Sequence, residues 1–134
     1  MRVALDTNVL ASAIGTRGLC ADVLRAVLLE HDLVVGECVL LELRRNLAKK
    51  FRLSPEVIAE FEALLRTQAQ MGPAATAVEI AGVDRNDARV LAEALAANAE
   101  VFITGDGKLQ ALEDRAPLPI LSPRQFWEFL HADG

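Results

Sequence analysis

Four acidic residues in this chain have types and positions that could form one site. Asp6 follows the apolar run Val3-Ala4-Leu5, and Asp106 follows the run 101–105. Because ligands and reacting groups gather beyond the carboxyl ends of parallel strands, both aspartates are expected to face one pocket. Glu42 and Asp87 lie where the same pocket can collect them. Four carboxylates in one pocket repel one another unless a cation compensates their charge, so a divalent metal site is the first hypothesis.

The other residue types that commonly carry catalysis form weaker patterns. Cys20 and Cys38 lack the CxxC or CxxxH spacing of a zinc site, and we expect two reduced, partly buried thiols. His31 and His131 stand alone, and no serine lies in a G-x-S-x-G elbow. The sequence therefore does not favour histidine acid–base chemistry or a serine nucleophile.

The net charge of −5 argues against a broad basic face of the kind that coats DNA. The chain nevertheless has one local basic run, just beyond Glu42. It places five cations within nine residues: Arg44, Arg45, Lys49, Lys50 and Arg52. This run is either a solvated helix face or a contact surface for RNA phosphates, and both interpretations stay open.

Hydrophobic periodicity and punctuation by glycine and proline predict alternating strands and helices. Ser54-Pro55 and Ser122-Pro123 each place serine at an N-cap and proline at the first helical position, which is a strong start signal. The first half is expected to hold a strand at 2–5, helices at 8–14 and 21–30, a strand at 33–35, a helix through Leu40, Leu43, Leu47 and Phe51, and a helix from 54 to 71–73. The second half is expected to hold a weaker strand at 75–80, a helix from 84–87 to 98, a strand at 101–104, a short helix at 107–113, a strand at 118–121 and a final helix after 122–123.

Strands separated by helices throughout predict right-handed crossovers and a mainly parallel sheet. The expected fold class is α/β, a three-layer sandwich of about five strands flanked by helices, built as a single domain over residues 1–134. Charges interrupt every apolar run before the roughly 18 residues that a membrane span needs. The start of the chain carries no signal-peptide pattern. We therefore expect a cytoplasmic protein without membrane association.

Four short motifs follow one another along the chain. They are Leu5-Asp6-Thr7-Asn8, Leu41-Glu42-Leu43, Asp84-x-x-Asp87 before a helix, and Ile103-Thr104-Gly105-Asp106. Together they resemble the PIN domain, the metal-dependent ribonuclease fold of VapC-type toxins and related nucleases. The resemblance extends over nearly the whole chain, and the segment 120–126 is similar to one bacterial and archaeal subgroup of toxin–antitoxin toxin components.

The resemblance implies a metal-dependent endoribonuclease whose acidic cluster holds Mg²⁺ or Mn²⁺. The implied catalytic and metal-binding residues are Asp6, Glu42, Asp87 and Asp106. The residue types agree with this, because hard divalent cations prefer oxygen ligands and can activate water in phosphodiester cleavage. Asn8 and Thr104 are expected to supply hydrogen bonds that orient the acids. The implied partners are RNA, a small antitoxin protein and a second copy of the chain in a homodimer.

Each acid also has a purely structural interpretation. Asp6 suits the N-cap of the helix that follows it, and Asp106 suits a turn. Asp84 and Asp87 both suit the first turn of the next helix, and Asp84 fits a cap better than a ligand. Glu42 is able to form an i,i+3 salt bridge with a cation on the same helical flank. These alternatives stay open at the level of the sequence.

The sequence departs from the resembling subgroup at one position, since Gly107-Lys108 follows the fourth acid where members often continue with another acid. Two rival functions remain. Asp6 together with Gly105-Asp106-Gly107-Lys108 also resembles a haloacid-dehalogenase phosphatase, although Asn8 stands where that family's second acid works and 134 residues is short for that fold. The other rival is a non-catalytic, PIN-like binding module with a weak metal site.

Overall fold

The computed structural model describes residues 1–73, 75 and 79–132. Within these residues, five short strands form one parallel sheet in the order β3-β2-β1-β4-β5. The strands are β1 (Arg2–Leu5), β2 (Asp32–Val35), β3 (Gln70–Met71), β4 (Val101–Ile103) and β5 (Ile120–Leu121). The predicted α/β fold with a parallel sheet of about five strands is confirmed.

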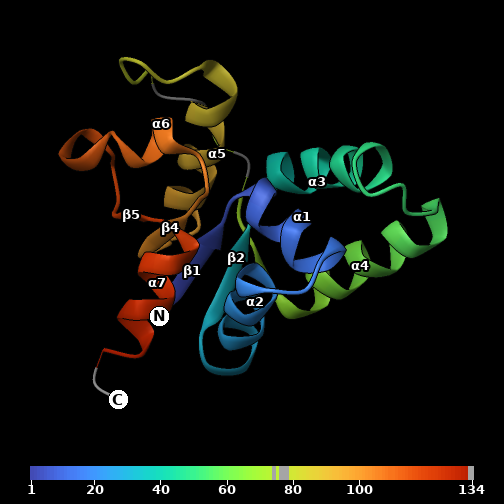
Figure 1. Ribbon diagram of the computed structural model, residues 1–134. Coiled ribbons are helices and arrows are strands. Elements are labelled where there is room, and N and C mark those ends of the chain that lie inside the picture. Colours follow the sequence, from blue (N-terminus) through green and yellow to red (C-terminus); the bar gives the residue numbers. More distant parts are fainter. Residues whose placement is uncertain (74, 76–78, 133–134) are drawn as a thin grey trace.

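Helices connect the strands throughout the described part of the chain. They are α1 (Thr7–Gly15), α2 (Leu19–Glu30), α3 (Glu37–Lys49), α4 (Pro55–Gln68), α5 (Arg85–Ala96), α6 (Gly107–Gln110) and α7 (Pro123–Leu130), with a 3-10 turn η1 at Glu113–Arg115. Figure 1 shows α1 to α4 gathered on one side of the sheet, and α5 and α6 on the other. Helix α7 contacts α2 and β5. The sheet is therefore covered on both faces, as predicted.

Both serine-proline start signals act as expected. The Ser54 hydroxyl accepts a hydrogen bond from the backbone N–H of Val57, and the Ser122 hydroxyl accepts one from Gln125, whose side chain bonds back to the Ser122 N–H. Such caps satisfy N–H groups that the first turn of a helix leaves without partners. Local sequence therefore fixes where α4 and α7 begin.

Several helix ends differ from the sequence prediction by a few residues, and those of α3 and α4 have a clear local cause. Helix α3 ends at Lys49, before Phe51, because the Leu53 N–H bonds the carbonyl of Leu47 and Arg52 adopts a left-handed φ of 53°. Helix α4 ends at Gln68, and the next residues pair with β2 as strand β3. A two-residue strand is too short to show an alternating pattern, so periodicity assigned it to the helix. The strand predicted over 75–80 falls largely on residues outside the described part.

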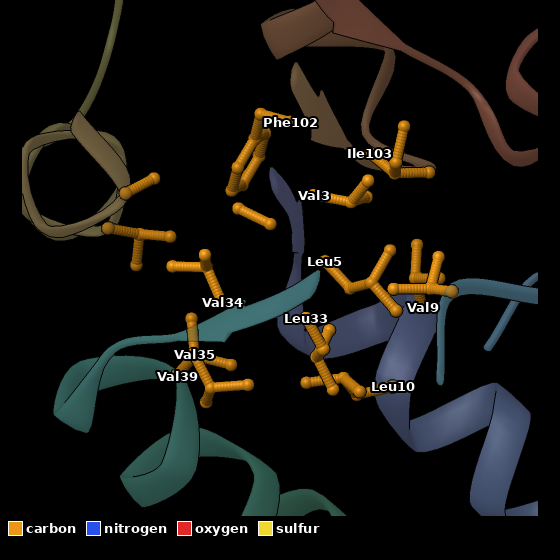
Figure 2. Close-up of a cluster of buried hydrophobic side chains, with 14 of the residues drawn as sticks. Val3, Leu5, Val9, Leu10, Leu33, Val34, Val35, Val39, Phe102 and Ile103 are labelled. Atoms are coloured by element: carbon orange, nitrogen blue, oxygen red, sulfur yellow. The ribbon is translucent and has the colours of Figure 1, made fainter. Parts of the chain in front are cut away.

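The core forms on both faces of the central strands. Parallel pairing aligns Ala4 of β1 with Val34 of β2 and Phe102 of β4, so these three buried side chains share one face. Leu5 points to the opposite face, and Figure 2 shows it close to α1. Since β1 lies in the middle of the sheet, the residue that follows it is held by packing on two sides.

In the part of the chain that the structure describes, no helix combines the length and the apolar character needed to cross a membrane.

Candidate active site

The direction in which successive strands are added to the sheet reverses at its centre, between β1 and β4. From β1 the sheet grows through β2 to β3, and from the neighbouring β4 it grows the other way to β5. Asp6 follows β1, and Asp106 lies three residues beyond β4. In open α/β sheets the carboxyl ends of the strands form a ligand-binding crevice at such a switch point. The two aspartates therefore lie where this fold class places its sites.

Asp6 is buried, with 8% of its surface exposed. Its Oδ1 accepts a hydrogen bond from the Thr7 N–H at 2.8 Å, which caps α1, and its Oδ2 accepts one from the Thr104 hydroxyl at 2.7 Å. Burial raises the pKa of Asp6, the two hydrogen bonds lower it, and the charges of Glu42 and Asp106 raise it. Capping therefore accounts for only one of its two oxygens.

Glu42 projects from α3 and is half-buried. Its Oε2 accepts a hydrogen bond from the Thr7 hydroxyl at 2.8 Å, and its Oε1 accepts one from the Asn86 side-chain amide. No ion pair involves Glu42 within the described residues. The alternative of a solvated salt bridge on the α3 surface is therefore wrong, because both carboxylate oxygens are turned towards α1 and α5.

Asp87 lies in the first turn of α5, and the Asp84 carboxylate caps this helix by accepting the Asp87 N–H at 2.8 Å. The structure thus supports the expectation that Asp84 is a cap. Burial raises the pKa of Asp87 to about 6, with further contributions from the charges of Asp84, Asp6 and Asp106 and from a hydrogen bond to the Asp84 side chain. Burial is the largest cause and the negative charges nearby add to it, so this carboxyl lacks a compensating cation.

Asp106 caps the short helix α6 by accepting the Lys108 N–H at 2.9 Å. Its own N–H donates to the Thr104 hydroxyl at 3.0 Å, so the fully buried Thr104 joins Asp106 to Asp6. Thr104 therefore makes the kind of contact that was expected of it. Asn8 behaves differently, since its side-chain oxygen accepts the Gly105 N–H at 3.3 Å and so holds the loop after β4.

Three polar residues of the site carried no role in the sequence analysis. Thr7 and Asn86 hold Glu42, although they are separated from it by 35 and 44 positions. Both lie within the short motifs named in the sequence analysis, so the sequence predicts where they lie but not that Glu42 is their hydrogen-bond partner. The third residue, Glu93, lies in the Ala/Leu-rich helix α5, where no local signal marks it.

Glu93 of α5 places its buried carboxylate beside the start of α3. Its Oε1 accepts the Cys38 N–H at 3.0 Å, and only 5% of its surface is exposed. A Cβ atom on Gly36 would lie 2.2 Å from that oxygen, so only glycine allows the approach. Glu93 therefore caps a helix whose own N-cap residue supplies no side chain.

The basic run beyond Glu42 does not form one uniform surface. Arg44 is paired with Glu62 of α4 at 2.6 Å. Arg45, Lys49 and Lys50 are exposed and form no ion pair within the described residues, and Arg52 lies in the turn after α3. Contact of this run with RNA stays a prediction.

Glu42, Asp87 and Asp106 each lie within electrostatic range of Asp6. The charges of Glu42 and Asp106 act on Asp6, and those of Asp6 and Asp106 act on Asp87. Within the described residues, no group of three or more His, Cys, Asp or Glu side chains is already arranged to hold a metal ion. The donor set still fits Mg²⁺ or Mn²⁺, because it consists of oxygens and its raised pKa values would be relieved by a cation.

Comparisons with known proteins agree with the fold. The family model described as PIN domain matches residues 2–108. A search of curated proteins finds no match. Three solved structures are similar over nearly the whole chain. VapBC2 from Rickettsia felis, bound to a DNA fragment from their promoter, has a TM-score of 0.61 and 16% identity, covering 91% of this chain and 98% of the matched chain.

The other two structures give similar values. VapBC-1 from nontypeable Haemophilus influenzae has a TM-score of 0.61 and 19% identity, covering 92% of this chain and 99% of the matched one. FitAcB from Neisseria gonorrhoeae has a TM-score of 0.55 and 15% identity, with coverages of 91% and 98%. At these identities the likeness concerns the fold.

Proposed function

The chain belongs to the PIN domain family, and on this premise we propose that it is a metal-dependent endoribonuclease that cleaves RNA phosphodiester bonds. The observation that carries the proposal is Asp6, a buried carboxylate at the switch point of the sheet. Three further acids, Glu42, Asp87 and Asp106, lie within electrostatic range of Asp6 or of one another. A buried carboxylate with further negative charges nearby is costly to a fold and is typical of a functional site.

In this proposal Asp6, Glu42, Asp87 and Asp106 hold Mg²⁺ or Mn²⁺. The bound cation would activate a water molecule and stabilise the leaving oxygen. The chain's own contribution is orientation. Thr104 and the Thr7 N–H fix the two oxygens of Asp6, while the Thr7 hydroxyl and Asn86 fix those of Glu42. Such hydrogen bonds set the direction in which a carboxylate presents its free lone pairs.

A direct test uses labelled single-stranded RNA and purified protein. With millimolar Mn²⁺ we expect cleavage that EDTA abolishes and that Asp6→Asn lowers at least a hundredfold. Asp22→Asn is the matched control, because Asp22 is an exposed acid in the first turn of α2, and this variant should cleave like the parent. Binding of RNA without cleavage under any divalent cation would indicate the binding module instead. Release of phosphate from small esters would indicate the phosphatase, which the family match already disfavours.

We also propose that the protein is the toxin of a toxin–antitoxin pair, acts in the cytoplasm and forms a homodimer. The support is the resemblance to VapC-type toxins and the similarity in fold to two VapBC assemblies. A small antitoxin would present Arg or Lys to the acids, because a cation reaching them compensates their charge as a metal does. Expression alone in a bacterial host should arrest growth, and Asp6→Asn or Asp106→Asn should restore it. Normal growth with soluble, active parent protein would contradict the toxin role.

A further inference from the structure

Two arginines lie beside the Glu42–Asn86 hydrogen bond, one on each of the helices that it joins. On α3, the residues Cys38, Glu42 and Arg45 follow at spacings of four and three, so they lie on one stripe of the helix. On α5, Asn86, Arg89 and Glu93 form a stripe of the same kind. The hydrogen bonds between the stripes show that these faces meet.

The contacts between the stripes place the two arginines relative to Glu42. Asn86 contacts both Glu42 and Cys38, and Glu93, seven residues later on α5, accepts the Cys38 N–H at the start of α3. Arg89 lies between Asn86 and Glu93 on its stripe and is therefore near Cys38, one turn before Glu42. Arg45 lies about one turn after Glu42 on α3.

Neither arginine has a partner of opposite charge within the described residues, although Glu93 follows Arg89 by one helical turn. Both are exposed. By contrast, Arg44 is paired with Glu62, and Arg66 is paired with Glu37. Burial and the charges of Glu42 and Glu93 raise the pKa of the Cys38 thiol, while the charges of Arg89 and Arg45 lower it, so both guanidinium groups lie within electrostatic range of Cys38.

We propose that Arg45 and Arg89 bind phosphates of the RNA backbone on either side of Glu42. The proposal rests on the function proposed above and adds the residues that hold the substrate strand. A polyanion approaching four carboxylates meets repulsion that flanking cations offset. Guanidinium groups suit this task because their planar fork binds phosphate through two parallel hydrogen bonds. The strand would cross the α3–α5 contact with its scissile phosphate at the acids.

The test separates binding from cleavage by measuring fluorescence anisotropy of a labelled single-stranded RNA in EDTA. Each lost phosphate contact lowers the salt slope of log K by about 0.7, which is about a fivefold loss of affinity at 0.1 M salt. We therefore expect roughly fivefold weaker binding for Arg45→Gln and for Arg89→Gln, and roughly 25-fold for the double variant. Arg66→Gln is the control, and it should bind like the parent. Arg45→Lys and Arg89→Lys should keep the parent's salt slope, because they keep the charge.

Equal salt slopes for the parent and the double glutamine variant would overturn the proposal, as would a parent that binds no RNA. Cleavage by the parent in Mn²⁺ reports on the proposed function separately. If the parent cleaves RNA while the double variant binds as tightly as the parent, the nuclease function stands and the arginine pair does not. If the double variant loses affinity for poly-L-glutamate as strongly as for RNA, the pair serves acidic polypeptides, which also contradicts the proposal.

Discussion

Replacing Asp87 by asparagine should stabilise the metal-free protein, because this residue carries the largest resolved electrostatic penalty of the site. Burial and the charges of Asp84, Asp6 and Asp106 raise its pKa to about 6, from 3.8 for the free side chain. Asparagine has nearly the same shape and no charge. The cap of α5 remains in the variant, because it depends on the Asp87 N–H and on the Asp84 carboxylate.

The size of the effect follows from the change in pKa. A difference of about 2 pKa units corresponds to about 3 kcal/mol between the protonation states. Because Asp87 is only half-buried, solvent screening reduces this to about 1.5 kcal/mol. Loss of a negative charge at the start of α5 removes about 0.5 kcal/mol of favourable dipole interaction. We expect a net gain of about 1 kcal/mol, or roughly 3–5 °C in Tm for a chain of this size.

The gain should depend on pH with a defined sign. Since the folded-state pKa of Asp87 lies above the unfolded value, the folded state binds more protons between about pH 4 and 6, and the parent loses stability as the pH rises through this range. Asp87→Asn lacks this loss. The two proteins should therefore have similar Tm values below about pH 4, and the variant should be more stable above about pH 6.

Thermal unfolding in EDTA between pH 4 and 8 measures both quantities. Asp22→Asn serves as the control, since it also removes an acid from the first turn of a helix but lies on α2 and is exposed. It should leave Tm unchanged or lower it slightly at every pH. The reasoning is refuted if Asp87→Asn destabilises the protein at pH 7.5, or if its effect is the same at pH 4 and pH 7.5.

Three other perturbations have equally definite outcomes. Millimolar Mn²⁺ should raise the parent's Tm by several degrees through binding to the folded state and raise that of Asp6→Asn by less, and equal shifts in differential scanning fluorimetry would contradict the metal site. Thr104→Val should lower the free energy of unfolding by about 2–3 kcal/mol in urea titrations, because the buried Asp6 carboxylate loses a donor, and a change below about 0.5 kcal/mol would show that this bond contributes little. Gly36→Ala should destabilise the fold by about 1–3 kcal/mol, because the new Cβ atom displaces the Glu93 carboxylate. Glu93→Gln keeps an acceptor for the Cys38 N–H and should cost less than about 1 kcal/mol. A larger loss of stability for Glu93→Gln than for Gly36→Ala would contradict the predicted clash between the Cβ atom and Glu93.

Sequence patterns located Asp6 and Asp106 because both depend on strands that are themselves visible in the sequence. A buried parallel strand is a short apolar run, and the polar residues that follow it fall at the carboxyl edge of the sheet. The order of the strands was not predicted in detail. β1 and β4 are neighbours in the sheet although nearly a hundred positions separate them in the sequence, and this pairing brings the two residues together.

The surroundings of Glu42 lay beyond the reach of local patterns. Its helix was predicted from the spacing of Leu40, Leu43 and Leu47, and that stripe shows only which face is buried. Which polar groups meet the other face depends on where α1 and α5 pass. The same limit explains why Glu93 was missed, since a glutamate in an Ala/Leu-rich helix is an ordinary surface residue until another helix starts beside it.

The site has two halves that are held in different ways, one by the central strands and the other by contacts between helices. Asp6 and Asp106 are fixed by adjacent central strands and share Thr104 as a common partner. Glu42 and Asp87 lie on α3 and α5, which are joined, within the described residues, by three polar contacts: Glu93 with the start of α3, and Asn86 with Cys38 and with Glu42. A hydrogen bond from the Thr7 hydroxyl links Glu42 to the residues that follow β1. Because β1 and β4 are buried on both faces, whereas Asn86 is exposed where α3 and α5 meet, the helix-borne half is the part of the site with more freedom to adjust when a cation binds.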